Sequence, residues 1–411
     1  MKRRDFFQRA TAAAGGAPFL QAAAQIGNRG NMKITDVKLF LVGASGRNYC
    51  FVKIDTDQGI HGIGEAYSCG PDEAVAAVVK DFKGWLVGQD PRNIEHLYSM
   101  MVNFTRFPGG LVVNAAISGI EHALWDIAGK AAGLPVYMLL GGKVREKIRL
   151  YQSAGGRDPQ QCAEAAKRIV EKYGYTAIKM RPQPDGDNSK PYNEITRGAA
   201  ARVKAVRDAL GPDVDIGCDI HARFFEVTRA ARLAKAIEPY NPMWLEEPIR
   251  PENEKAMVKL SERVSIPLAS GECNYMRHEF RRLLDLQALD IIQPDICLCG
   301  GIMEMKKIAA MAEAHYVTVA PHNPMGPLAT AVNVHFAAST PNFFILEYHA
   351  DDESPRKDLL KAPLPMKDGY IPVPTKPGWG VELNEEAFAK YPAKPWHRGF
   401  DYGADGKVGY I

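Results

Sequence analysis

The chain has 411 residues, of which 46% are hydrophobic and 24% charged, and its formal net charge is +3. These values are typical of an ordinary globular protein that is long enough for two domains. The small net charge and the lack of a basic stripe with interleaved aromatic residues argue against nucleic acid as a partner. No window approaches the roughly 18 unbroken apolar residues of a membrane span.

The first 30 residues differ in composition from the rest. Arg3 and Arg4 precede Phe6 and Phe7, and a weakly apolar Ala/Gly stretch with the small residues QAAAQ follows. This order resembles a twin-arginine export signal, and the alternative is a short basic tail without a role. We expect residues 1–30 to be a signal that directs the chain to the periplasm. Without such a signal the protein would be cytoplasmic.

Residues 32–145 are predicted to form an α+β domain. Apolar and polar residues alternate up to about residue 65, which predicts strands, and later segments carry apolar residues at i, i+3 and i+4, which predicts helices. Strands followed by a block of helices are typical of the α+β class.

Short apolar strands alternate with helical segments from about residue 147. Eight such units predict a TIM-type (β/α) barrel over residues 146–370. A doubly wound open sheet is the alternative, but the count of eight and the lack of a G-x-G-x-x-G turn argue against it. The tail, residues 371–411, is predicted to fold back over the N-terminal domain. The predicted strands are residues 147–155, 176–182, 214–221, 243–248, 266–272, 290–295, 317–323 and 343–349.

Nearly every predicted barrel strand ends in a charged or titratable residue. In such barrels the catalytic groups lie at the C-terminal ends of the strands, and buried charge without a role there is costly. We therefore interpret these ends as an active site. The residues are Lys179, Arg181, Asp219, His221, Glu246, Glu247, Glu272, Asp295, His322 and Glu347.

Three carboxylates, Asp219, Glu246 and Glu272, end successive strands. They would repel each other unless a cation lies between them, and all-oxygen ligands favour Mg²⁺. The alternative is three separate helix caps. Glu246 is preferred to Glu247 because it lies nearer the strand, ahead of the Pro248 turn. Glu247 is expected to face the other way and pair with a lysine or arginine.

Two histidines are candidates for proton transfer. His322 and Asp295 end adjacent strands, so the carboxylate can accept from the imidazole and raise its basicity, which makes His322 a candidate general base. The alternative is a buried histidine satisfied by a neighbour. His221 and Asp219 are two residues apart on one strand and therefore point to the same face. Their alternative is a helix-capping aspartate and a loop histidine.

The motifs CDIHARF, WLEEP, ASGE and ILEYH, in this order, resemble those of the enolase superfamily. Within it they resemble mandelate racemase/muconate lactonizing enzyme-like acid-sugar dehydratases such as the D-galactonate dehydratases. The resemblance extends from residue 32 to about residue 390. It implies a barrel with an N-terminal capping domain that the C-terminal tail completes, a Mg²⁺ cofactor, a sugar-acid substrate and a homo-oligomer.

The resemblance also implies a reaction, the Mg²⁺-dependent dehydration of a galactonate-like sugar acid to a 2-keto-3-deoxy acid. His322, oriented by Asp295, would remove the C2 proton and form an enediolate, and His221 would protonate the departing C3 hydroxyl. Glu347 would hydrogen-bond a carboxylate oxygen as charge builds there, and Lys179 would help to hold the carboxylate.

One position departs from the family's racemases. They carry Lys-x-Lys on the second strand, and Arg181 replaces the second lysine here. Arginine stays protonated and is a poor base, so two-base racemisation is disfavoured. Arg181 is instead a predicted substrate contact, together with Arg47 and Arg106 in the predicted lid loops. The alternatives are a racemase, epimerase or cycloisomerase of the same superfamily and, more distantly, a non-catalytic sugar-acid binding protein.

Overall fold

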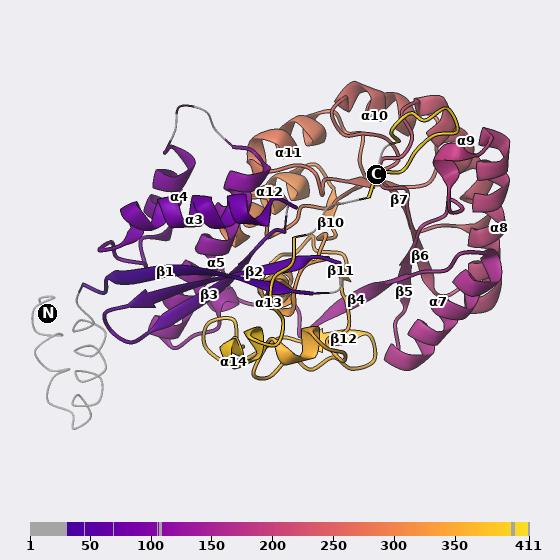
Figure 1. Cartoon of the computed structure of the whole chain (residues 1–411). Coiled ribbons are helices and arrows are strands. Elements are labelled where there is room, and N and C mark those ends of the chain that lie inside the picture. Colours follow the sequence, from indigo (N-terminus) through magenta and orange to yellow (C-terminus); the bar gives the residue numbers. More distant parts are fainter. Residues whose placement is uncertain are drawn as a thin grey trace, which may run out of the picture.

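The computed structural model describes residues 31–44, 46–68, 70–104, 106, 109–395 and 399–409. A small antiparallel sheet with its helices lies beside a larger barrel of parallel strands that is ringed by helices (Figure 1). The predicted export signal, residues 1–30, lies outside the described residues and stays a prediction. Within the described part, no helix has both the length and the apolar character that a membrane span needs.

The N-terminal part is a three-stranded antiparallel sheet in the order β1-β2-β3, with helix α5 packed on β3. Two glycines of β3 allow the close approach. An added Cβ would lie 1.9 Å from the Ala123 carbonyl oxygen at Gly62 and 2.0 Å from the Gly119 carbonyl oxygen at Gly64. The elements are β1 (Ile34–Gly43), β2 (Asn48–Thr56), β3 (His61–Ala66), α3 (Asp72–Leu86), α4 (Ile94–Val102), α5 (Leu111–Ala132) and α6 (Val136–Leu139).

Eight parallel strands form the barrel in chain order from β4 to β10, and β11 pairs with β4. A parallel bridge between Val319 and Phe343 joins β10 to the segment that leads into β11, so the sheet closes on itself. The predicted (β/α) barrel is confirmed, and the closed ring excludes the doubly wound sheet. Its strands are β4 (Lys147–Ala154), β5 (Ala177–Met180), β6 (Asp215–Asp219), β7 (Trp244–Glu246), β8 (Leu268–Ser270), β9 (Ile291–Ile292), β10 (Thr318–Val319) and β11 (Leu346–Glu347).

Helices lie on the outside of this ring (Figure 1). The first of them shows how the sequence sets its ends: Asp158 accepts from the Gln161 N–H at its start, and Gly174 ends it in the left-handed conformation. The helices are α7 (Pro159–Tyr173), η1 (Asp187–Ser189), α8 (Tyr192–Leu210), α9 (Val227–Ile237), η2 (Glu238–Tyr240), α10 (Glu254–Ser261), α11 (Met276–Asp285), α12 (Ile302–Ala314), α13 (Pro327–Ala338), η3 (Arg356–Asp358) and α14 (Glu385–Phe388).

An apolar layer fills the barrel interior. Trp244 is fully buried there, and it packs against Gly217, where an added Cβ would lie 2.9 Å from the indole. The indole Nε1 of Trp244 donates to Glu246 at 2.9 Å. Trp244 therefore forms a floor beneath the charged groups at the strand ends. The other members of the layer are Tyr151, Ala177, Ala269, Ile291, Ala320 and Ile345.

Two buried glutamates of the N-terminal part cap helices of the barrel. Glu65 of β3 accepts from two backbone N–H groups in the first turn of α13, at 2.6 and 2.8 Å. Glu121 of α5 accepts from two backbone N–H groups at the start of α12, both at 2.9 Å. The first turn of a helix lacks internal acceptors for such groups, and its dipole favours a negative charge there. These contacts fix the N-terminal part on the barrel.

The chain after residue 369 contacts both parts of the molecule. β12 (Tyr370–Pro372) pairs antiparallel with β4 of the barrel. Trp379 is fully buried, and its indole donates to the Ile63 carbonyl of β3 at 3.0 Å. The segment from residue 399 is the yellow end of the chain in Figure 1. Within it, Asp401 contacts Arg223 and Asn188. The tail thus runs from the N-terminal part to the end of the barrel that carries the charged residues.

Candidate active site

A cavity of about 1390 Å³ lies at the C-terminal ends of the barrel strands, and Tyr49 and Tyr67 of the N-terminal part also line it. Its volume is ample for a small polar ligand. Asp295 and Glu246 lie buried behind its wall. The predicted site residues that line it are Arg47, Lys179, Arg181, Asp219, His221, Glu272, His322 and Glu347.

Lys179 lies at the centre of a buried group of carboxylates. Its Nζ is 2.9 Å from Glu246, 3.1 Å from Asp219 and 3.1 Å from Glu347. Only 6% of its side chain is exposed. Burial opposes the charged form, but the carboxylates, with Glu246 first, hold the pKa of Lys179 well above its ordinary value. Lys179 therefore supplies a fixed positive charge to the floor of the cavity.

The carboxylates outnumber the cations around them. Glu247 and Glu272 also line the cavity, and burial together with Glu272 raises the pKa of Glu247 to about 8. Asp219 Oδ2 and Glu272 Oε2 are buried and accept no well-formed hydrogen bond, although Lys179 Nζ and His221 Nε2 lie 3.1 and 3.2 Å from Asp219 Oδ2. Crowded carboxylate oxygens with so few donors fit a divalent cation such as Mg²⁺. As they stand, however, no three acidic, His or Cys side chains of the described residues are arranged so that they could hold a metal.

Glu246 and Glu247 take different positions in the site: Glu246 is buried behind the cavity wall, whereas Glu247 lines the cavity. Glu246 is fully buried between Lys179 Nζ and Trp244 Nε1, both 2.9 Å away. The prediction that Glu247 faces away and pairs with a basic residue is wrong, because Glu247 lines the cavity and accepts from the side chain of Ser270. Its φ of +42° breaks the strand alternation on which that prediction depended. Glu246 stays the predicted cation ligand, and Glu247 becomes a second candidate.

His322 is held between two carboxylates. Its Nδ1 lies 2.8 Å from Asp295 Oδ2, and its Nε2 lies 3.7 Å from Glu272 Oε2. Burial opposes its protonation, but Glu272 and then Asp295 raise the pKa of His322 to about 10. An ionised carboxylate can only accept hydrogen bonds, so Asp295 keeps a proton on Nδ1 of His322. The other ring nitrogen, Nε2, faces Glu272.

His221 lies on the other side of the cluster. Its Nε2 is 3.2 Å from Asp219 Oδ2, and 51% of its side chain is exposed. Its backbone N–H donates to Asp219 Oδ1 at 2.9 Å. His221 and Ala222 both have a positive φ, +54° and +50°, which is rare for residues with a side chain. The segment is therefore bent sharply just beyond β6.

Glu347 and His349 follow the alternation of the last strand. Glu347 accepts from Asn323 N at 3.0 Å and pairs with Lys179, whose charge keeps the pKa of Glu347 below its ordinary value although burial opposes this. His349 also lines the cavity, and burial lowers its pKa to about 4. We did not predict His349 as a site residue. His349 lies two residues after Glu347, the same spacing by which Asp219 led to His221, so that rule could have predicted it.

The three predicted arginine contacts differ in their positions. Arg181 lines the cavity and pairs with Asp187 at 2.9 Å. Arg47 lines it too, with Nη1 at 3.4 Å from the sulfur of Met325. Arg106 is exposed and is not among the described residues that line the cavity. Its neighbours at 105, 107 and 108 lie outside the described residues, so the role of Arg106 stays a prediction.

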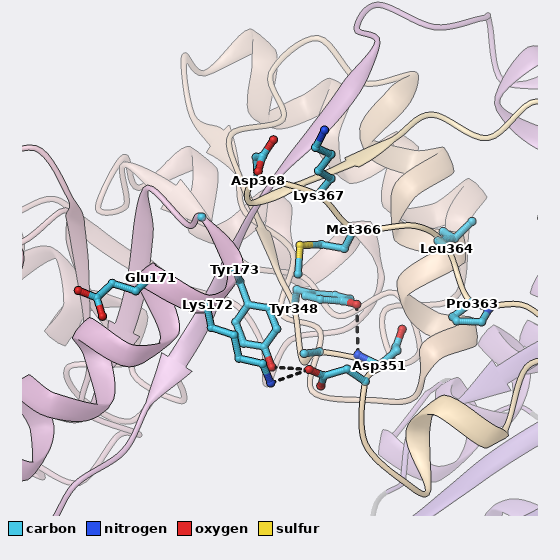
Figure 2. Close-up of a pocket in the computed structure, with 13 residues that line it drawn as sticks. Glu171, Lys172, Tyr173, Tyr348, Asp351, Pro363, Leu364, Met366, Lys367 and Asp368 are labelled. Carbon is cyan, nitrogen blue, oxygen red and sulfur yellow. Dashed lines mark hydrogen bonds and ion pairs between the residues drawn. The ribbon is translucent and has the colours of Figure 1, made fainter.

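A second cavity of about 500 Å³ adjoins the first and shares Tyr173, Ala350 and Asp352 with it. Figure 2 shows the ammonium of Lys172 and the hydroxyl of Tyr173 pointing at the same oxygen atom. This oxygen belongs to Asp352 and lies 2.7 Å from each of them. These groups are paired with each other at the rim and leave no unsatisfied cluster. The chemistry is therefore expected in the larger cavity.

Comparison with known proteins gives matches along almost the whole chain. Residues 30–141 match the mandelate racemase / muconate lactonizing enzyme N-terminal domain, and residues 161–387 match the enolase C-terminal domain-like family. A D-galactonate dehydratase of Variovorax paradoxus is 38% identical over 92% of this chain and 99% of its own length. A D-xylonate dehydratase of Haloferax volcanii is 37% identical over 86% of this chain and 88% of its own length.

Solved structures agree with these matches. An enolase from Agrobacterium radiobacter, crystallised with bound Na and L-malate, superposes with a TM-score of 0.89 at 38% identity, covering 92% of this chain and 100% of that one. A member of the enolase superfamily from Salmonella Typhimurium gives a TM-score of 0.82 at 39% identity, covering 88% of this chain and 99% of that one.

Proposed function

The chain belongs to the mandelate racemase/muconate lactonizing enzyme family of the enolase superfamily, and on that premise we propose that it dehydrates a sugar acid to a 2-keto-3-deoxy acid. One observation carries the proposal: His221 and His322 flank a single carboxylate cluster, 3.2 Å from Asp219 and 3.7 Å from Glu272 respectively. Dehydration needs one base and one acid at one substrate. The D-galactonate and D-xylonate dehydratases among the relatives support this reaction.

The proton transfers follow from the two histidines. His322 takes the C2 proton on Nε2 in its neutral form, since Asp295 holds the proton on Nδ1. The negative charge of Glu272 is the main cause of its raised pKa, so this neutral form is reached when a cation neutralises Glu272. The electrons of the C2–H bond pass into the carboxylate group as an enediolate. They return to form the C2=C3 double bond as the C3–O bond breaks, and His221 donates the proton with which the hydroxyl leaves as water. The enol that remains tautomerises to the 2-keto acid.

The floor of the cavity holds the substrate carboxylate. Asp219, Glu246 and Glu272 are the proposed ligands of Mg²⁺, which when bound supplies positive charge where the carboxylate gains electrons. Lys179 adds a second, fixed charge at the same place. Glu347 is already an acceptor for Asn323 and Lys179. We therefore assign it to orienting Lys179 rather than to the direct substrate contact expected from the sequence.

Racemisation or epimerisation needs a second base opposite His322. The position where the related racemases carry that base is occupied by Arg181, which pairs with Asp187 at 2.9 Å. A guanidinium stays protonated and cannot remove a proton. The residues of this cavity therefore suit elimination of water, with His221 as the acid, better than racemisation or epimerisation.

Purified protein should release 2-keto acid, detected with semicarbazide, when it is incubated with Mg²⁺ and a panel that includes D-galactonate and D-xylonate. Loss of a positioned acid or base costs on the order of 10²–10⁴-fold in rate. His322→Asn should stop both dehydration and exchange of the C2 hydrogen in D₂O. His221→Asn should slow dehydration and leave C2 exchange measurable by proton NMR.

Each outcome separates the candidate functions. If both variants dehydrate at the wild-type rate, the two histidines have no role in the reaction. Exchange at C2 with inversion and without loss of water would instead show a racemase or epimerase. Substrate binding without exchange or loss of water would show a binding protein.

A further inference from the structure

The end of the described chain rests against the segment that carries His221. Asp401 accepts from Arg223 Nη1 at 2.7 Å and from Asn188 Nδ2 at 2.9 Å. A bridge between Tyr402 and Val408 closes the chain after Asp401 into a small loop. A carboxylate from the far end of the sequence thus contacts a residue only two positions beyond the candidate acid.

This loop packs closely against Asn188 of η1. Gly409 N donates to the Asp401 carbonyl at 2.7 Å. An added Cβ at Gly409 would lie 2.2 Å from Asn188 Nδ2, the same atom that donates to Asp401. The loop and η1 therefore touch through backbone as well as through a charged hydrogen bond.

Arg223 is the centre of a small charge network. Only 10% of its side chain is exposed, and it pairs with Asp401 and, at 3.1 Å, with the buried Asp187. Asp187 also pairs with Arg181 at 2.9 Å. Two arginines therefore share two carboxylates. Without the charge of Asp401, Asp187 would be shared by both guanidinium groups, one of them largely removed from water.

The backbone between β6 and Arg223 needs such an anchor. His221 and Ala222 adopt left-handed conformations, which persist only where the surroundings hold them. On the strand side the Ala222 N–H donates to the Glu247 carbonyl at 2.7 Å. On the other side the ion pairs of Arg223 hold the segment. Loss of either restraint lets the strained residues relax.

We propose that Asp401 is a positioning residue for His221: by anchoring Arg223 it holds residues 219–225 in the conformation that presents the imidazole to the cavity. Asp401 is not among the described residues that line the cavity, so it acts through Arg223 and not on the substrate. The expected effect of Asp401 on the rate of dehydration rests on the proposed function, in which His221 is the acid. The expected effect on the conformation of residues 219–225 does not depend on that function.

The first test compares Asp401→Asn with Asp405→Asn. Asp405 is an exposed residue of the same loop whose side chain accepts only from Lys407 N in the described contacts, so the control makes the same charge change. Asp401→Asn should lower kcat for dehydration about 10–100-fold, as expected for a displaced acid. KM and the rate of C2 exchange in D₂O, which depends on His322, should stay within about twofold of wild type. Asp401→Glu should restore part of kcat.

Equal kcat in the two Asn variants would overturn the proposal. So would a parallel loss of dehydration and C2 exchange, because the tail would then act on the whole site. If wild-type protein neither exchanges C2 nor dehydrates any acid, the proposed function fails, and the second test decides the role of Asp401.

The second test needs no substrate. Amide hydrogen–deuterium exchange of a peptide that covers residues 219–225 should be faster in Asp401→Asn than in Asp405→Asn, because the amides of His221 and Ala222 lose their fixed acceptors. Gly409→Ala, which displaces the loop without changing charge, should show the same increase. Unchanged exchange in both variants would overturn the proposal.

Discussion

Replacing Lys179 with methionine tests whether the carboxylate cluster depends on an internal cation. Methionine has a similar length and no charge, so the change removes Nζ from three carboxylate oxygens at 2.9–3.1 Å and leaves little empty space. The side chain is 6% exposed, so water can reach its place only from the cavity and replaces the charge poorly. Breaking a buried charge pair on one side costs about 3–5 kcal/mol. We expect the free energy of unfolding to fall by that amount in EDTA.

Urea unfolding near neutral pH measures this loss. Tryptophan fluorescence is a suitable signal, because Trp244 donates to Glu246 directly beneath the cluster. Lys172→Met is the matched control. Its ammonium pairs with Asp352, but 51% of its side chain is exposed, and such pairs contribute only about 0.2–1 kcal/mol.

A Lys179→Met variant that loses no more stability than Lys172→Met would refute the reasoning. The carboxylates would then be neutralised by bound protons, and Lys179 would contribute only through packing. A further consequence can be checked in the same samples. Mg²⁺ should stabilise Lys179→Met more than wild type, because the ammonium and the metal compete for the same oxygens.

Three other predictions follow from the sequence and the site. EDTA should abolish release of 2-keto acid and Mg²⁺ should restore it, since the three proposed carboxylate ligands need a cation; full activity of metal-free protein would contradict the site. Changing Arg3 and Arg4 to lysine should retain the protein in the cytoplasm, as followed by cell fractionation; unchanged periplasmic recovery would argue against a twin-arginine signal. Burial lowers the pKa of His335 to about 4, so below about pH 6.5 the unfolded chain binds a proton that the folded chain excludes. This histidine should cost ~1.4 kcal/mol of stability per pH unit down to that pKa, and a urea midpoint with the same pH dependence in His335→Gln as in wild type would contradict the prediction.

The barrel could be predicted because its signals are local. Most strands are short apolar runs followed by a helix, and nearly every run after β4 ends beside a charged residue. The spacing of two pointed to both Asp219 and His221, and the structure brings both to the cavity, although His221 reaches it through a φ of +54° and not through a continued strand. The same rule, applied after Glu347, would have found His349.

The missed features depend on backbone turns or on distant parts of the chain. Glu247 reaches the cavity because its φ is +42°, and no alternation rule foresees a left-handed residue with a side chain. The role of Arg106 stays a prediction, because its neighbours at 105, 107 and 108 lie outside the described residues. Asp401 contacts Arg223 across 178 positions, and a pairing this distant has no local signature.

The capping glutamates limit how this protein can be redesigned by recombination. Glu121 needs a glycine opposite it, because an added Cβ at Gly301 would lie 2.2 Å from its carboxylate, and Gly326 stands at 2.5 Å in the same relation to Glu65. A barrel joined to an unrelated N-terminal domain would keep the space beside Gly301 and Gly326 without a glutamate in it. The first-turn N–H groups of α12 and α13 would then lack acceptors. Substrate range should therefore be altered by exchanging single loops, with each glutamate and its glycine kept as an inseparable pair.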